Sequence, residues 1–202
     1  MFFKAKHIPN LLTIIRILFV PIIVTLTLVP SYQIIYHLTI YQATYTIYLN
    51  YFVAGILFLV ACLTDALDGY LARRNKWISD FGKLWDPIAD KILINSVLIC
   101  FAFQKSTFVW MPIIMIGRDV IVDALRMYAS SQKKVIPANL FGKLKTIFQM
   151  LAIIVIFFGF NSSDTTKYLN YYLCQNGLMY LALITSVVSG IIYFTRWYRK
   201  DQ

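Results

Sequence analysis

The sequence predicts an all-α membrane protein with six transmembrane helices around a polar site that faces the cytoplasm. Hydrophobic residues make up 59% of the 202-residue chain, charged residues only 14%, and the mean hydropathy is +0.67. A soluble domain carries about 25% charged residues. Six apolar segments are each long enough to cross a bilayer, which takes about 20 helical residues. No internal repeat or linker interrupts them, so residues 1–202 form one predicted domain.

Each expected span is an apolar run with polar or basic residues near its ends. The six spans are residues 11–29, 48–72, 81–103, 107–129, 139–160 and 168–198. The last is longer than a bilayer requires, so we expect it to tilt or to extend beyond the membrane. Residues 30–46 form a tyrosine-rich connection, and tyrosine is enriched at membrane interfaces.

The basic residues predict the orientation of these spans. Only Lys105 and Lys167 of the 19 lysines and arginines fall in loops on the side opposite both termini, which leaves 17 on the other side. Because basic residues accumulate on the cytoplasmic side, both termini and the polar site should be cytoplasmic. The net charge of +10 does not indicate nucleic acid as a partner, since no basic run is interleaved with aromatic residues.

Four aspartates lie where the second and third spans meet their connecting turn. Inserting one charged carboxylate into the centre of a membrane costs about 2.5–3.5 kcal/mol of free energy, so four of them together indicate a functional site. On a helix, Asp65 and Asp68 share a face with Gly69 and Ala72. In the next helix three residues recur every fourth position on one face, namely Gly82, Asp86 and Asp90. A short turn makes the two helices antiparallel neighbours whose acidic faces oppose one another.

Carboxylate oxygens favour hard cations, Mg²⁺, Mn²⁺ or Ca²⁺, over zinc. Four acids suffice for two such ions, the neighbouring glycines let a phosphate approach the backbone, and Arg73 is placed to pair with that phosphate. The pattern therefore predicts metal-assisted phosphoryl transfer. The alternative is a buried ion-pair network with the nearby basic residues Arg73, Arg74, Lys83 and Lys91.

A second polar group lies on the fourth and fifth spans. Four cations, Arg118, Arg126, Lys143 and Lys145, exceed what Asp119 and Asp123 can neutralise. The surplus suits an anionic small molecule, and phosphate is the natural candidate because arginine binds it through two hydrogen bonds. Alternatively, the lysines extend to the membrane interface and the arginines pair with the two aspartates.

The central residues resemble the signature of the CDP-alcohol phosphatidyltransferases without a departure at any fixed position. The pattern here is Asp65-x2-Asp68-Gly69-x2-Ala72-Arg73-x8-Gly82-x3-Asp86-x3-Asp90. The resemblance implies a six-helix membrane enzyme that cleaves a CDP-linked lipid and releases CMP as an alcohol attacks. It also implies two Mg²⁺ or Mn²⁺ ions on the four aspartates, and room for cytidine beside Gly69, Ala72 and Gly82. Arg73 would neutralise the diphosphate, and Asp90 would take the proton of the alcohol.

Residues 8–16, 117–126 and 142–150 are similar to segments of one branch of this family, the bacterial phosphatidylglycerophosphate synthases. That resemblance implies CDP-diacylglycerol and glycerol 3-phosphate as substrates and the bacterial plasma membrane as the location. The resemblance does not decide whether the protein forms a homodimer. Two departures are Asp119, where glutamate is expected, and the length of the 30–46 connection. A cardiolipin synthase or an inositol-type transferase is the alternative within the family. An ion transporter or channel is the alternative from another class, because intramembrane aspartates also line ion pathways.

Overall fold

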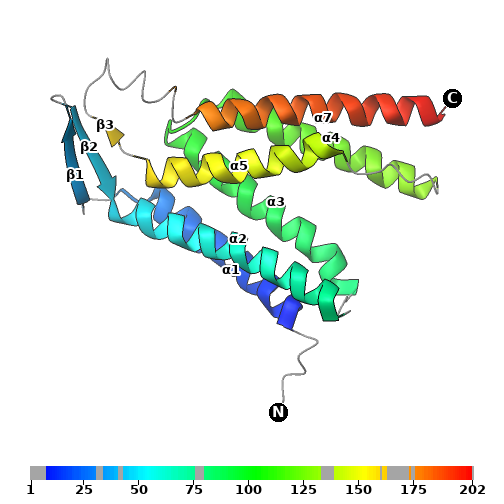
Figure 1. Cartoon of the computed structure of the whole chain (residues 1–202), viewed down its shortest axis with the longest axis horizontal. Helices are drawn as coiled ribbons and strands as arrows, with labels where there is room; N and C mark the ends of the chain where they lie inside the picture. The colour runs from blue at the N-terminus through cyan, green and yellow to red at the C-terminus, as the bar shows by residue number, and fades with distance from the viewer. Residues whose placement is uncertain are drawn as a thin grey trace, which may run out of the picture.

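The structure is a computed structural model. It describes residues 8–30, 34–40, 43–75, 80–132, 139–159, 161–162, 173 and 176–201. Six long helices form the bulk of this part of the chain (Figure 1): α1 (Ile8–Leu28), α2 (Leu49–Asn75), α3 (Asp80–Phe103), α4 (Trp110–Ser131), α5 (Leu140–Phe158) and α7 (Gly177–Asp201). They coincide with the six apolar segments that the sequence predicts, apart from the start of the last one.

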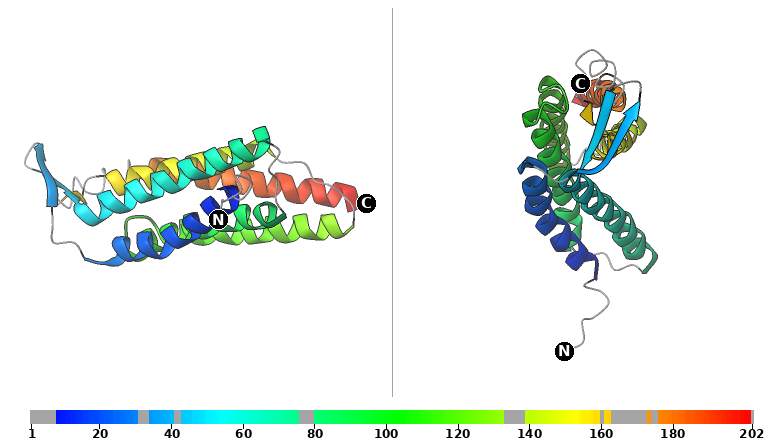
Figure 2. Two further views of the ribbon diagram at one scale, coloured as in Figure 1. Left: turned by 90° about the horizontal axis from the view of Figure 1, so that it is seen from below. Right: turned by 90° about the vertical axis from the view of Figure 1, so that its left-hand side faces the viewer.

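The helices form two groups. In the first, α1 packs against both α2 and α3, and in the second, α7 packs against both α4 and α5. Contacts of α5 with α2, and of α4 with α3, join the groups. Figure 1 shows α5 and α7 side by side along the long axis of the structure, and the right-hand view of Figure 2, which looks along that axis, shows α1 and α2 inclined to it. Elements distant in sequence, such as α1 and α3, therefore bring their side chains to common sites.

The prediction of an all-α protein is incomplete, because a small antiparallel sheet lies at one end of the helices (Figure 1). It contains β1 (Ile34–Ile40), β2 (Ala43–Tyr48) and β3 (Asn161–Ser162), in the order β1-β2-β3. The first two strands pair from Ile34 opposite Tyr48 to Ile40 opposite Ala43. This stretch is rich in Tyr, Ile and Thr, the residues that favour strands.

Aromatic side chains form the contact between α2, α3 and α5. The rings of Phe101 and Phe157 meet edge to face with centroids 4.8 Å apart, and Phe58 is fully buried beside them. A Cβ added to Gly55 on α2 would lie 2.9 Å from the Cβ of Phe157, which is closer than side chains tolerate. Glycine at this position thus lets α2 approach α5.

The described part of the chain has an apolar core, but it also buries several charged side chains and exposes many large apolar ones. Large apolar side chains such as Ile113 and Val120 are each 64% exposed, whereas Arg16, Asp119 and Lys145 are buried. Exposed apolar surface of this extent fits contact with lipid. By length and apolar composition, three described helices suffice to cross a membrane, namely residues 11–28, 140–158 and 177–198. The chain is therefore a membrane protein whose apolar core also encloses charged groups.

Side-chain amides brace the helix ends that lie nearest the sheet. Asn50 donates to the carbonyl oxygens of Leu26 and Val29 at 3.0 and 2.8 Å, which satisfies the free end of α1. Gln104 accepts from the hydroxyl of Tyr51 at 2.8 Å and donates to the carbonyl of Thr27. These bonds hold α1, α2 and α3 together at the end remote from the aspartates.

Candidate active site

Three of the predicted acids lie beside two residues of α1, and we call this set (Thr13, Arg16, Asp65, Asp86 and Asp90) the acid cluster. One guanidinium nitrogen of Arg16 lies 2.8 Å from a carboxylate oxygen of Asp65 and 2.7 Å from one of Asp90. The hydroxyl of Thr13 donates to Asp86 at 2.5 Å. Thr13 and Arg16 are three residues apart and so share a face of α1. That face covers the acids of α2 and α3.

Arg16 decides the geometry of the cluster. Its side chain is fully buried, whereas those of Asp65 and Asp90 are each 31% exposed. Since both oxygens contact the same nitrogen, they are at most about 5.5 Å apart, the sum of the two contact distances. A buried cation of this kind is tolerated only when carboxylates compensate it. The two acids are therefore held close together although they come from different helices.

The structure does not describe the side chains of the other residues predicted to bind the donor lipid and the metal. Asp68, Gly69, Ala72 and Arg73 are on α2 and Gly82 is on α3, but only their backbone is described. Among the residues whose side chains are described, no three His, Cys or Asp groups lie close enough together to hold a metal ion. The metal roles of Asp65, Asp68, Asp86 and Asp90 thus stay a prediction.

The chemistry of the described acids nevertheless fits a divalent cation. Arg16 supplies one positive charge against the three carboxylates Asp65, Asp86 and Asp90, so the acid cluster keeps a negative excess. All its ligand atoms are oxygens, which hard cations prefer.

A second group of charged residues surrounds Asp119, and we call this set (Arg118, Asp119, Arg126, Lys145, Ser189 and Tyr193) the cation cluster. Asp119 accepts from Arg118 at 2.9 Å and from Lys145 with its other oxygen. Arg118 also donates to the hydroxyl of Ser189 at 2.6 Å. Lys145 is only 6% exposed, so the alternative that it extends to the membrane interface is wrong.

Tyr193 of α7 organises the other side of the cation cluster. Its hydroxyl accepts from Arg126 and, at 3.2 Å, from the main-chain N–H of Asn139. The guanidinium of Arg126 lies 4.7 Å from the centroid of the Tyr193 ring, a cation–π geometry. Arg126 is therefore oriented by a phenol, not by either aspartate of its own helix. Asp123 pairs instead with Lys91 of α3.

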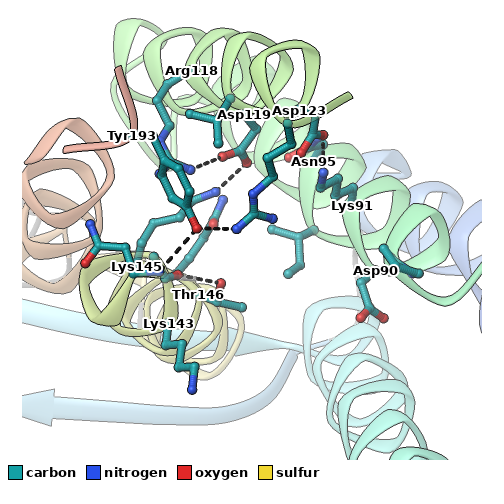
Figure 3. A pocket seen from close by; sticks show the side chains of 17 residues that line it. Asp90, Lys91, Asn95, Arg118, Asp119, Asp123, Lys143, Lys145, Thr146 and Tyr193 are labelled. Atoms are coloured by element: carbon teal, nitrogen blue, oxygen red, sulfur yellow. Dashed lines mark hydrogen bonds and ion pairs between the residues drawn. The ribbon is translucent and has the colours of Figure 1, made fainter. Parts of the chain in front are cut away.

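A pocket of about 310 Å³ connects the two clusters. Asp90 lines it together with all four predicted cations, Arg118, Arg126, Lys143 and Lys145. Figure 3 shows Asp90 on one side and Arg118, Tyr193 and Lys145 on the other, with Lys143 directed away from the cluster. The charged lining residues are five bases, Lys91, Arg118, Arg126, Lys143 and Lys145, and three acids, Asp90, Asp119 and Asp123. The pocket thus combines a surplus of positive charge with one member of the acid cluster.

Comparison with known protein families matches residues 6–188 to the CDP-alcohol phosphatidyltransferases. The chain belongs to this family. A CDP-diacylglycerol–glycerol-3-phosphate 3-phosphatidyltransferase of Mycoplasma pneumoniae is 38% identical over 96% of this chain and 88% of its own length. Its counterpart in Mycoplasma genitalium is 37% identical over 96% of this chain and 85% of its own length. The Bacillus subtilis enzyme of the same name is 30% identical over 94% of each chain. The family is in general metal-dependent.

Several residues of this phosphatidyltransferase site were not predicted as site residues from the sequence. Arg16 gives a signal in retrospect, because it is the one charged residue in the apolar run 11–29. Such a residue is expected to face a partner inside the protein. Ser189 and Tyr193 give no comparable signal, because uncharged polar residues are common in membrane helices. Only the packing of α7 against α4 brings them to the cations.

The dependence of the acid cluster on Arg16 is testable. Arg16→Met should destabilise the purified enzyme by about 3 kcal/mol, because removing one partner of a buried ion pair leaves the other charge uncompensated. Thermal unfolding in detergent measures this effect. The matched control is Arg196→Met at an exposed position of α7, which should change stability by less than about 0.5 kcal/mol. Adding Asp65→Asn to Arg16→Met should restore part of the loss. Equal stability of the two arginine variants would contradict this account.

Proposed function

We propose that this enzyme transfers the phosphatidyl group of CDP-diacylglycerol to glycerol 3-phosphate, which yields phosphatidylglycerophosphate and CMP. The observation that carries the proposal is that Asp90 belongs to the acid cluster and also lines the pocket with Arg118, Arg126, Lys143 and Lys145. A donor diphosphate at the acids and an acceptor phosphate at the cations would then meet beside one carboxylate. The names of the Mycoplasma and Bacillus relatives support the same pair of substrates.

The donor lipid is assigned to the ends of α2 and α3. Asp65, Asp68, Asp86 and Asp90 would hold two divalent ions, Mg²⁺ or Mn²⁺. When bound, such ions neutralise the diphosphate and stabilise the charge that develops as CMP leaves. Gly69, Ala72 and Gly82 leave space for the cytidine, and Arg73 supplies a further positive charge.

The acceptor is assigned to the pocket. Arg118 and Lys145 both form ion pairs with Asp119, so their positions are fixed before the acceptor binds. Arg126 is fixed in the same way by Tyr193. Guanidinium groups held in this manner bind phosphate without further ordering, and such positioning lowers the barrier to reaction. The surplus of bases over acids in the lining favours a dianionic phosphate.

Asp90 is assigned the proton transfer. The C1 hydroxyl oxygen of glycerol 3-phosphate forms a bond to the lipid-linked phosphorus, the bond from that phosphorus to the CMP oxygen breaks, and the hydroxyl proton passes to Asp90. Arg16 contacts one carboxylate oxygen of Asp90 at 2.7 Å and so fixes the direction of the group. A general base must be oriented toward the proton that it accepts.

The site is further proposed to face the cytoplasm, with all six helices crossing the membrane. The distribution of basic residues supports this orientation, with 17 of 19 on the side of the termini. Reporters fused after Gln202 and inserted at residue 75 should both lie inside the cell, and one inserted at residue 163 outside. Reporters at 75 and 163 on the same side would contradict the six-span arrangement.

Three other assignments are less well supported. A channel or transporter would distribute its acids through the membrane depth, whereas Asp65 and Asp90 converge on one arginine nitrogen. A cardiolipin synthase would use phosphatidylglycerol as acceptor, and an inositol-type transferase a polyol or its phosphate.

A CMP-release assay with CDP-diacylglycerol and a panel of acceptors tests the proposed function. Glycerol 3-phosphate should be the best substrate, and unphosphorylated glycerol a poor one, because the charged hydrogen bonds to phosphate contribute about 1.5–3 kcal/mol each. Turnover with phosphatidylglycerol but not with glycerol 3-phosphate would place the enzyme in the cardiolipin branch.

The assignment of the cations has its own test. Arg118→Ala should raise the KM for glycerol 3-phosphate at least about tenfold and change the KM for CDP-diacylglycerol little, since only acceptor contacts are lost. Arg196→Ala, at an exposed site on the same side of the protein by the proposed orientation, is the control. If Arg118→Ala altered both KM values alike, the cations would support the fold and not bind the acceptor.

A further inference from the structure

The pocket contains three buried nitrogen donors that have no hydrogen-bond partner: Nε of Arg118, Nδ2 of Asn139 and Nε2 of Gln149. Buried donors are nearly always paired, because leaving one unpaired is costly. Among the described residues that line the pocket, these are the only unpartnered buried side-chain polar atoms, and none is an acceptor. The pocket therefore suits a ligand that presents several acceptor oxygens.

The amide of Asn139 is fixed by its place at the start of α5. Its side-chain oxygen accepts from the N–H of Phe141 at 3.2 Å and caps the helix. Its main-chain N–H donates to Tyr193 at 3.2 Å. Only the side-chain NH₂ remains for a ligand, so its direction is set before any ligand binds.

Gln149 lies four residues after Lys145 and therefore one helical turn farther along the same face of α5. It is 1% exposed, the most deeply buried polar residue of the lining. A neutral amide is poorly matched to a phosphate that already has several basic side chains. It is well matched to a neutral hydroxyl, because one side-chain N–H donates one hydrogen bond.

We infer that Gln149 determines acceptor specificity by donating a hydrogen bond to the C2 hydroxyl of the acceptor. The inference rests on the proposed function, in which the cations take the phosphate and Asp90 faces the C1 hydroxyl. The C2 hydroxyl is then the one acceptor group left without an assigned partner. A site built to bond a hydroxyl rejects the analogue that lacks it, because the protein donor is left unpaired.

The experiment compares glycerol 3-phosphate with 3-hydroxypropyl phosphate, which lacks only the C2 hydroxyl. Wild-type enzyme should prefer glycerol 3-phosphate by at least about tenfold in kcat/KM. Gln149→Leu should use the two acceptors nearly equally, while its KM for CDP-diacylglycerol stays within about twofold of the wild-type value. If Gln149→Leu does not give folded protein, Gln149→Met takes its place in the same comparison.

Gln104→Leu is the matched control, because the amide of Gln104 is paired with Tyr51 and Thr27 at the far end of the helices. It should unfold at a lower temperature yet keep the wild-type preference between acceptors. Gln149→Leu should unfold at the wild-type temperature or above it in the absence of substrate, since it removes an unpaired buried donor. If Gln149 had only a structural role, Gln149→Leu would instead unfold at a lower temperature than the wild-type enzyme.

The possible results separate this inference from the proposed function. Retention of the wild-type acceptor preference by Gln149→Leu would overturn the inference, and so would a wild-type enzyme that does not distinguish the two acceptors. If wild-type enzyme transferred no phosphatidyl group to glycerol 3-phosphate, the proposed function itself would fail.

Discussion

The shared contact of Arg16 with Asp65 and Asp90 is the interaction on which the rest of the site depends. It joins α1, α2 and α3 at one point inside an apolar bundle, where a single uncompensated charge would be strongly unfavourable. Because one guanidinium nitrogen serves both carboxylates, acids from two helices must converge. Asp90 is thereby held at the border between the acid cluster and the pocket. The position proposed for proton transfer thus follows from an ion pair that also stabilises the fold.

Two clusters of opposite charge coexist within one helical bundle because each contains its own counter-charge. Arg16 neutralises part of the negative charge of the acids, and Asp119 neutralises part of the positive charge of Arg118 and Lys145. Neither compensation is complete, which leaves a negative excess at one side of the pocket and a positive excess at the other. The unpaired donors of Asn139 and Gln149 extend this pattern. Stability is given up at the positions where substrate oxygens are proposed to bind, as is common in active sites.

The helices were predictable from sequence because apolar runs of about 20 residues admit few other structures. The convergence of the acids followed from spacing within each helix. The partners across helices did not, since periodicity gives the face of a residue and not the helix that it meets. Arg16, Ser189 and Tyr193 are site residues whose partners lie on other helices, so the sequence alone did not predict their contacts. The strands in residues 34–48 are not signalled by hydropathy, which indicates only a connection between two spans, although the Tyr, Ile and Thr content of this segment is typical of strands.

Crystals of the enzyme grown with Mn²⁺ and CDP-diacylglycerol would test the central claim most directly, that the acid cluster binds the donor diphosphate through divalent ions. Anomalous scattering locates manganese independently of the protein model. The account predicts manganese within about 2.2 Å of carboxylate oxygens of the acid cluster, bridging to the diphosphate of the lipid. Donor lipid bound elsewhere, or manganese bound away from Asp65, Asp86 and Asp90, would contradict it.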